Sequence, residues 1–412
     1  MEKPASYSSM GASRSGSCDF LVIGSGILGV CIARELRRRY RNRVLVIDKE
    51  ASAGMHASGR NSGVLHTGIY YKPDTLKARF CVEGNRRMRA YCISKGLPMN
   101  QSGKVIVART AADLPTLQEL HRRGLANGVH AGLVDPQELR ELEPCARTVE
   151  RALFVKDTAV VNPRIVMEFL VEDALREGVT FEFDRAWMGC ARLGEANTSR
   201  GPISYGHLLN CSGLFADRIS HSFGVGREYR ILPFRGLFYR LNPQSQVQVH
   251  GNIYPVPDLR NPFLGIHFTR RPEDEVIIGP SALPLLGREQ YVGLKGANWR
   301  DAMMMGRYLT RLFGSNRDHF RAIAWKEIVK TSKTGFYREA AALVSGLAKD
   351  DLLRGQHAGI RAQLVNTQTA QLLDDFVVES GPRSTHVLNA VSPAFTSALP
   401  FAEYVVDALK GD

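Results

Sequence analysis

The sequence predicts an α/β protein whose N-terminal part is a doubly wound, Rossmann-like sheet covered by helices. Residues 19–23 are a short apolar run, typical of a strand buried on both faces. Residues 24–29 have the pattern G-x-G-x-x-G and lead into a predicted helix over 30–40. A second apolar strand, residues 44–47, ends in Asp48. A glycine-rich turn between strand and helix, with an acid after the next strand, is typical of a domain that binds a dinucleotide.

Each residue of this motif has its own physical role. Gly24 permits the tight turn, and Gly26 lets the backbone approach a pyrophosphate. Gly29 allows the helix to pack closely on the strand, and the helix N-terminus faces the phosphates. Asp48 can accept hydrogen bonds from a ribose diol, and its charge would repel a 2′-phosphate. The predicted dinucleotide site therefore comprises Gly24, Gly26, Ile27, Gly29, Asp48 and Lys49. The alternative is a glycine-rich turn that binds no ligand.

The composition argues against several classes of protein. The chain has 412 residues, 44% hydrophobic and 23% charged, which disfavours disorder, collagen-like repeats and a disulfide scaffold. No stretch approaches the roughly 18 consecutive apolar residues of a membrane-spanning helix. The seven cysteines have no C-x-x-C spacing, so we expect free thiols in a reducing compartment and no metal site. Residues 1–17 lack the apolar core of a secretory signal, and we expect a disordered tail rather than an organellar presequence.

The formal net charge of +13 favours anionic partners. The densest basic run, residues 37–43, ends the first predicted helix, where cations suit the helix dipole. We interpret this run as a solvated helix end, with a membrane-contacting patch as the alternative. The arginines are scattered and form no long basic surface interleaved with aromatics, so we expect no nucleic-acid partner.

A second glycine-rich passage, residues 53–71, stands where a nicotinamide-binding domain would continue with further βα units. Four glycines lie between Gly54 and Gly68. They predict backbone held close against a flat or anionic ligand, because glycine lets a chain approach without a side chain. An ordinary loop is the alternative.

From this passage onward the chain resembles the L-2-hydroxyglutarate dehydrogenase family, within the D-amino-acid-oxidase-like flavoproteins. Family members carry a similar N-S-G-V-x-H-x-G-x-Y-Y passage, here residues 61–71, followed by L-K-A-x-F-C-x-x-G-N, here residues 76–85. Further matching blocks are residues 211–218, 233–236, 261–270, 358–363, 373–376 and 392–398. The blocks run in order from Cys18 to Leu409 and cover nearly the whole chain.

The resemblance implies FAD held by a discontinuous domain of the glutathione-reductase type. An α+β substrate domain built on an antiparallel sheet would be inserted into it. We expect the FAD-binding domain to comprise residues 18–98, 150–225 and 355–412, and the substrate domain to comprise residues 99–149 and 226–354. The residue pattern agrees, because residues 160–177 read as a strand followed by a helix and residues 203–213 as a strand returning to the sheet.

The resemblance also implies further residues that contact FAD: His56, Asn61, Ser62, Gly63, Ser212, Gly213, Asp217, Gly359, Ser392 and Ala394. In relatives that demethylate N-methylated glycines, a histidine near the position of His56 carries covalent FAD, but here we expect non-covalent FAD. A helix is predicted from Ser392 or Pro393 to Leu409. Its N-terminus would stabilise negative charge at the pyrimidine edge of the flavin, or the helix packs only for stability.

Oxidation of a 2-hydroxy acid requires a base for the hydroxyl proton, and histidine titrates near neutrality. We favour His66 over His267, which would otherwise bind a carboxylate. Arginine binds carboxylates through two hydrogen bonds, so Arg361 is the first predicted clamp and Arg235 the second. An internal ion pair is the alternative for each arginine. Tyr71 would either hydrogen-bond the substrate or pack the loop with its ring.

Two lysines, Lys77 and Lys104, also fall in or near apolar blocks rather than in solvent-facing runs. We expect Lys77 to support the loop or to shield charge near the flavin. Tyr70 has the same two interpretations as its neighbour Tyr71.

The resemblance implies an FAD-dependent dehydrogenase that oxidises L-2-hydroxyglutarate to 2-oxoglutarate and passes electrons to a membrane quinone or another carrier. The basic surface fits peripheral attachment to anionic lipid. We therefore expect a cytoplasmic protein, peripheral on the inner membrane, or a mitochondrial one. The alternatives are an oxidase or dehydrogenase of amino acids, N-methylglycines or another 2-hydroxy acid, and, less favoured, a tRNA-binding flavoprotein.

Overall fold

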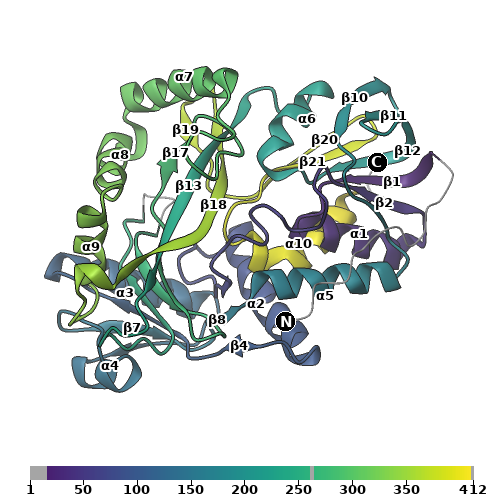
Figure 1. The fold of residues 1–412 in the computed structure, drawn as a ribbon. Coiled ribbons are helices and arrows are strands. Elements are labelled where there is room, and N and C mark those ends of the chain that lie inside the picture. The colour runs from purple at the N-terminus through teal and green to yellow at the C-terminus, as the bar shows by residue number, and fades with distance from the viewer. Residues whose placement is uncertain (1–15, 260–263, 410–412) are drawn as a thin grey trace.

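The computed structural model describes residues 16–259 and 264–409, and it contains two large sheets side by side (Figure 1). The first sheet follows the order β10 (Trp187–Arg192), β11 (Glu195–Thr198), β12 (Ile203–Asn210), β1 (Ser17–Ile23), β2 (Val44–Ile47) and β9 (Thr180–Glu182). β21 (Ser384–Asn389) pairs with β12, and β20 (Val377–Gly381) pairs with β21. The pairs that join β9, β2, β1, β12 and β21 are parallel. The predicted doubly wound sheet is therefore confirmed.

Helices cover both faces of this sheet. α1 (Ile27–Tyr40), α2 (Leu76–Ser94), α5 (Pro163–Arg176) and α10 (Ala394–Ala408) lie on one face, and α6 (Ala216–Ser222) lies on the other (Figure 1). Alternate residues of a strand point to opposite faces. Val22 of β1 thus packs with Val30 of α1, whereas Leu21 and Ile23 pack with Ile219 of α6. The apolar run at β1 is uninterrupted because both faces of the strand are buried.

The second sheet is mostly antiparallel. Its order is β19 (Gln371–Leu372), β18 (Leu352–Asn366), β13 (Tyr229–Leu241), β16 (Val276–Gly279), β15 (His267–Arg270), β14 (Asn252–Pro255), β5 (Lys104–Val107), β7 (Ala152–Val155) and β6 (Ala131–Val134), and β17 (Leu283–Pro284) pairs with β13. Only β14 and β5 run parallel among the described pairs of this sheet. A small sheet of β3 (Val64–Leu65), β8 (Ala159–Val161) and β4 (Met99–Asn100) lies between the two halves. The predicted antiparallel α+β part is also confirmed.

Strand β5 has a core on each side. Ile106 packs with Leu117 of α3 (Leu114–Ala126). Val105 and Val107 pack instead with α4 (Pro136–Leu142) and α9 (Lys333–Ala341). By the same alternation Lys104 falls on the side of Ile106. The remaining helical segments are α7 (Trp299–Ser315) and α8 (Phe320–Val329), with the short turns η1 (Ala111–Asp113), η2 (Gly213–Phe215), η3 (Arg317–His319) and η4 (Lys349–Asp351).

The chain passes between the two halves several times, as a discontinuous domain requires. By strand pairing, however, β7 and the whole of β18 and β19 belong to the second sheet, because β18 pairs with β13 from residue 352 to residue 366. The return to the first sheet comes at β20, later than the expected boundary at 355. Ser17 begins β1, while residues 1–15 of the expected tail and 261–263 of one matching block lie outside the described residues. Among the described helices, none combines the length and apolar character needed to cross a bilayer.

Candidate active site

A cavity of about 640 Å³ lies between the two large sheets. On one side it is lined by the residues that follow β1, β2 and β12, at the carboxyl ends of these parallel strands. On the other side it is lined by residues of β13, β14, β15 and β18. Ligands of doubly wound sheets bind at the carboxyl ends of the strands, and the volume is that of a small-molecule site.

The glycine turn has the shape that the sequence predicted. Gly24 has φ of 102°, and a Cβ there would lie 2.6 Å from the carbonyl oxygen of Cys211. A Cβ at Gly29 would lie 1.9 Å from the carbonyl oxygen of Gly24, so the helix can approach the turn only without it. Gly26, the N-cap of α1, makes no side-chain hydrogen bond, the Ser58 hydroxyl accepts from the backbone N–H of Ile27 at 2.9 Å, and the first turn of the helix lines the cavity. This cradle fits a pyrophosphate, because the helix N-terminus is positive.

Asp48 fixes the cradle to the end of β2. Its Oδ2 accepts hydrogen bonds from the backbone N–H of Ser25 at 2.7 Å and from the Ser25 hydroxyl at 2.6 Å. Its Oδ1 accepts from the backbone N–H of Glu50 at 3.0 Å. The carboxylate lines the cavity, where the sequence predicted a ribose partner. Asp48 therefore holds the turn as well as facing the ligand.

Sequence reasoning missed an aromatic residue at this end of the cavity. Trp187 of β10 lines it, and its indole N–H is buried without a hydrogen-bond partner among the described residues. A flat apolar ring with a free donor fits a heterocyclic base. The local sequence gave no signal for this, because Trp187 reaches the site through the pairing of β10 with β11 and β12.

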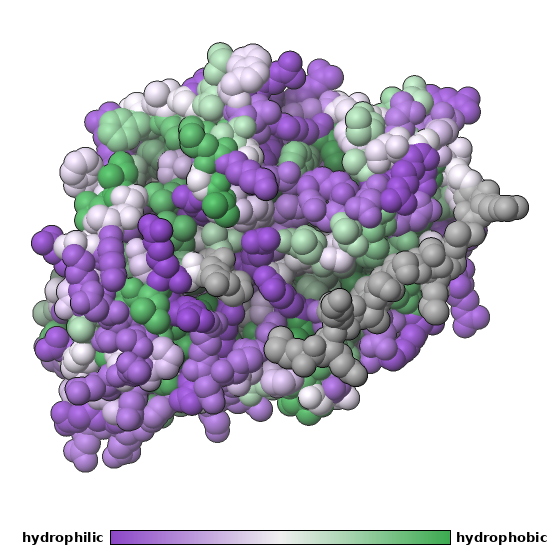
Figure 2. Space-filling model, in the orientation of Figure 1, coloured by the Kyte–Doolittle hydropathy of each residue, from purple (hydrophilic) through white to green (hydrophobic). Residues whose placement is uncertain are grey.

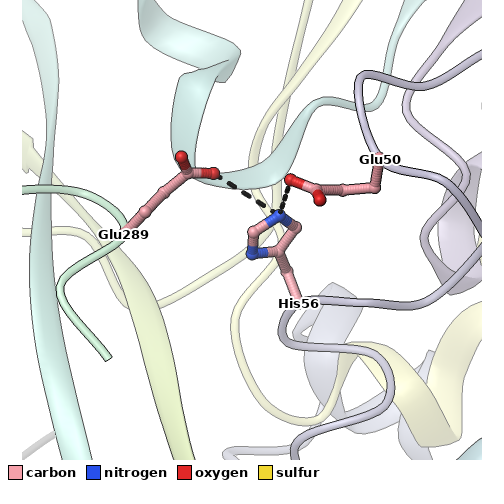
Figure 3. Close-up of side chains that lie close together, drawn as sticks. All are labelled: Glu50, His56 and Glu289. Carbon is pink, nitrogen blue, oxygen red and sulfur yellow. Dashed lines mark hydrogen bonds and ion pairs between the residues drawn. The ribbon is translucent and has the colours of Figure 1, made fainter. Parts of the chain in front are cut away.

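His56 lies in a network of ion pairs at the rim of the cavity (Figure 3). Its Nε2 is 2.9 Å from Glu50 Oε1 and 3.4 Å from Glu289 Oε1, and its Nδ1 is 2.7 Å from the Tyr291 hydroxyl. The ammonium group of Lys49 pairs with both carboxylates. Since both ring nitrogens are engaged and Lys49 pairs with both acids, the geometry makes this cluster a structural link between the loop after β2 and residues 285–298.

The opposite end of the cavity holds the two predicted histidines. His66 follows β3, and its backbone N–H donates to the Thr396 hydroxyl of α10 at 3.1 Å. His267 begins β15, and its Nδ1 lies 2.9 Å from the carbonyl oxygen of Gly265. Because a carbonyl can only accept, Nδ1 carries the proton and the neutral ring presents the lone pair of Nε2. The ring stacks on Tyr254, with centroids 3.8 Å apart.

Both histidines are held uncharged by their surroundings. They are 8% and 6% exposed, and burial lowers the pKa of each to about 3. The positive charge of Lys104 acts in the same direction on both. A neutral imidazole presents a lone pair that can accept a proton, but a pKa of about 3 makes both histidines weak bases until the negative charge of a bound substrate raises it.

Arg361 lies on β18 and lines the cavity, as predicted for a carboxylate clamp. Its Nε donates to the side-chain oxygen of Gln363 at 3.1 Å. Burial lowers the pKa of Arg361 below its ordinary value, yet a guanidinium remains protonated in proteins. The residue therefore offers a fixed positive charge at the histidine end.

Arg235 and Tyr71 do not line the cavity. Phe234 and Gly236 of β13 line it, so the intervening Arg235 points away by the alternation of the strand, and it donates to the carbonyl oxygen of Tyr291. Tyr71 packs its ring against the ammonium group of Lys77, 5.4 Å from the ring centroid. Of the two interpretations given for Tyr71, the geometry supports loop packing.

Three predicted cofactor residues are likewise set back from the cavity. Gly29 and Gly63 allow close packing, since a Cβ at Gly63 would lie 2.0 Å from the carbonyl oxygen of Val161. Asp217 is 1% exposed and receives Arg288 Nη2 at 2.9 Å. The other predicted residues line the cavity: Gly24, Gly26, Ile27, Asp48, Lys49, His56, Asn61, Ser62, Ser212, Gly213, Gly359, Ser392 and Ala394, together with His66, His267 and Arg361.

The fold and the glycine cradle define the class of the protein. A family model described as FAD dependent oxidoreductase matches residues 19–408, and the chain belongs to that class of flavoproteins. The chain is 33% identical to the L-2-hydroxyglutarate dehydrogenase of Escherichia coli over 403 residues, covering 95% of this chain and 93% of that one. It is 33% identical to the mitochondrial L-2-hydroxyglutarate dehydrogenase of Homo sapiens over 427 residues, covering 97% and 91%. Within the flavoproteins it therefore belongs to the L-2-hydroxyglutarate dehydrogenase family.

Solved structures agree on the fold. An FAD-bound L-α-glycerophosphate oxidase from Mycoplasma pneumoniae superposes with a TM-score of 0.75 at 19% identity, covering 96% of this chain and 95% of that one. L-Proline dehydrogenase from P. horikoshii superposes with a TM-score of 0.72 at 16% identity, covering 97% and 95%. The expected cofactor, FAD, is thereby confirmed, and the cradle and the long cavity fit it.

The buried pair of Asp217 and Arg288 generates a prediction about stability. Asp217→Ala removes the carboxylate that Arg288 hydrogen-bonds and leaves Asp301, 3.6 Å from Arg288 Nε, to balance this buried charge, so the free energy of unfolding should fall by about 3 kcal/mol. Urea denaturation followed by circular dichroism measures it. The control Glu172→Ala removes an exposed carboxylate of α5 that pairs with Arg176 and should change stability by less than about 1 kcal/mol. An Asp217→Ala protein with unchanged stability but lost FAD would instead assign Asp217 to the cofactor.

Proposed function

We propose that the protein is an FAD-dependent dehydrogenase that oxidises L-2-hydroxyglutarate to 2-oxoglutarate. One observation carries this proposal: a single cavity joins the dinucleotide cradle to an end where His66, His267 and Arg361 meet. That end combines a neutral base with a fixed cation, which is what oxidation of a hydroxy acid requires. The names of the two relatives support the same substrate.

The reaction divides between the cofactor and the chain. Bound FAD supplies the acceptor for the hydride that leaves C2 of the substrate. His267 takes the hydroxyl proton at Nε2, because its Nδ1–H is already committed to Gly265. Loss of one hydride and one proton converts the hydroxy acid into the oxo acid. Arg361 binds the carboxylate next to C2 and so holds the single C2 hydrogen of the L enantiomer toward the cofactor.

His66 is the second candidate for the base. The sequence favoured it, and it lines the same cavity. Its Nδ1 is buried and has no hydrogen-bond partner among the described residues. No hydrogen bond therefore fixes which nitrogen of His66 carries the proton, and for this reason the geometry favours His267.

Substrate reduction of the bound flavin tests both the substrate and the base. L-2-Hydroxyglutarate should bleach the flavin absorbance of the wild-type holoenzyme under anaerobic conditions, whereas D-2-hydroxyglutarate, malate, glycerol 3-phosphate and sarcosine should not. His267→Gln should slow the bleaching by about 100-fold or more, because a general base contributes about 100- to 10,000-fold. His66→Gln is the matched control and should slow it by less than about tenfold. Bleaching by sarcosine alone would refute the proposed substrate, and the reverse order of the two variants would make His66 the base.

We further propose that the electrons leave to a membrane quinone and that the protein rests on the anionic face of an inner membrane, in the cytoplasm or in a mitochondrion. The supporting feature is a surface on α7 and α8, where hydrophobic side chains gather among hydrophilic ones (Figure 2). The name α7–α8 surface stands for five residues that are between 51% and 69% exposed: Trp299, Met303, Phe313, Trp325 and Ile328.

The spacing of this surface is that of an interfacial helix. Trp299, Met303 and Phe313 fall on one stripe of α7, since residues four and fourteen apart share a helix face. Arg300, Arg307 and Arg311 form a neighbouring stripe, and all three are exposed. Exposed Trp and Phe beside cations suit a membrane interface with anionic lipid.

Vesicle binding tests this part of the proposal. The holoenzyme should sediment with phosphatidylglycerol vesicles and much less with phosphatidylcholine vesicles. The double variant Trp299→Ser, Trp325→Ser should bind about tenfold more weakly, because it removes buried apolar area at the lipid boundary. Met188→Ser, Leu193→Ser is the matched control, with side chains 68% and 55% exposed on the opposite half of the protein. Equal loss in both double variants would contradict docking through α7 and α8.

A further inference from the structure

Lys104 is a buried cation without a counter-ion in the part of the chain that the structure describes. It begins β5, is 1% exposed, and its ammonium group has no hydrogen-bond partner among the described residues. The next three residues of the strand are apolar and buried. A charge in such a place costs stability unless something pairs with it, and a methionine would pack there at less cost. Folding alone therefore does not explain a lysine at this position.

The position of Lys104 relates it to the cavity. Its ammonium nitrogen lies 4.4 Å from the ring centroid of Tyr70 and 5.1 Å from that of Tyr254. Tyr254 lines the cavity and stacks on His267. The charge of Lys104 thus lies one aromatic ring behind the cavity wall. Over that distance a charge acts strongly on a ligand, because water is excluded and the local dielectric constant is low.

The charge balance at this end of the cavity is then simple. Burial keeps His66 and His267 neutral, so neither supplies positive charge to an anion. Arg361 supplies one fixed cation on the cavity wall. Lys104 supplies a second cation behind the wall. Lys104 has no hydrogen-bonding partner for its charge among the described residues, and together with the charge of Arg361 it suits a ligand that carries two negative charges.

We infer that Lys104 is a specificity-determining residue that selects substrates with a second carboxylate, acting across the rings of Tyr70 and Tyr254. This inference rests on the proposed function and deepens it. Arg361 holds the carboxylate next to the reacting carbon, and Lys104 attracts the distal one. Monocarboxylic hydroxy acids leave Lys104 unpaired and so bind less well.

The surroundings of Lys104 also link this selection to pH. Burial lowers the pKa of Lys104 to about 7. The groups that face it are Cys81 of α2, Tyr70, Tyr254 of β14, and the two histidines. Burial raises the pKa of the Cys81 thiol to about 12 and raises the pKa of both tyrosines. Near neutrality the proton that is gained or lost in this group is therefore that of Lys104.

The sign of the pH effect follows. Below pH 7 Lys104 is charged and attracts a dianion, and as the pH rises above 7 the free protein loses this charge. Binding of a dicarboxylate should therefore weaken from pH 7 to pH 9. An arginine at the position would stay charged throughout this range, because its pKa exceeds 12.

The test uses the holoenzyme and two ligands that cannot be oxidised, glutarate and butyrate, with binding followed by the change in flavin absorbance. Lys104→Met should weaken glutarate binding by at least about tenfold and butyrate binding by less than about threefold. Lys104→Arg should keep glutarate binding near the wild-type value and abolish its weakening between pH 7 and pH 9. Lys104→Met should also melt no lower than the wild type, because it removes an unpaired buried charge.

Each other outcome has a definite meaning. Equal weakening of glutarate and butyrate in Lys104→Met, or a lower melting temperature, would assign Lys104 a structural role and overturn the inference. So would glutarate binding that is unchanged in Lys104→Met. A wild-type holoenzyme that binds glutarate but is not bleached by L-2-hydroxyglutarate would refute the proposed function, whatever the variants do. If L-2-hydroxyglutarate bleaches the wild-type holoenzyme but Lys104→Met discriminates between glutarate and butyrate as the wild type does, this inference alone would be refuted.

Discussion

The burial of the titratable side chains at one end of the cavity is the constraint on which the proposed chemistry depends. In water, histidine has a pKa near 6.5 and lysine near 10.4. Where the second sheet meets the loop after β3, burial moves the pKa of His66 and His267 to about 3 and that of Lys104 to about 7. Both imidazoles are therefore neutral and present a lone pair, while the positive charge resides on Arg361 and in part on Lys104.

The two halves of the protein provide complementary parts of this arrangement. The first sheet supplies a rigid cradle, because Asp48 ties the glycine turn to β2 through both donors of Ser25. The second sheet supplies side chains at fixed register, so that Tyr254, His267 and Arg361 reach one cavity from three strands. The link from the backbone of His66 to Thr396 fixes the histidine loop to α10. The base and the cofactor cradle are thus held relative to one another by the fold.

Features that depend on local sequence could be predicted, and those that depend on register or long-range pairing could not. Gly24, Gly26 and Asp48 belong to one continuous motif whose spacing carries its geometry. Arg235 does not line the cavity, because the alternation of side chains along β13, which the sequence does not show, turns it to the other face of the sheet. Asp217 finds its partner Arg288 seventy-one residues away, so its pairing was invisible locally. Sequence reasoning also missed Tyr254, because its place in the cavity depends on the pairing of β14 with β15 and β5.

Nitrogen-15 NMR of labelled histidines in the holoenzyme tests the central claim most directly, with His66 and His267 assigned from their glutamine variants. The account predicts that both side chains keep the shifts of neutral imidazole down to pH 5, and that His267 carries its proton on Nδ1. Conversion of either ring to imidazolium near pH 6.5 would show that water reaches this end of the cavity, and it would contradict the account.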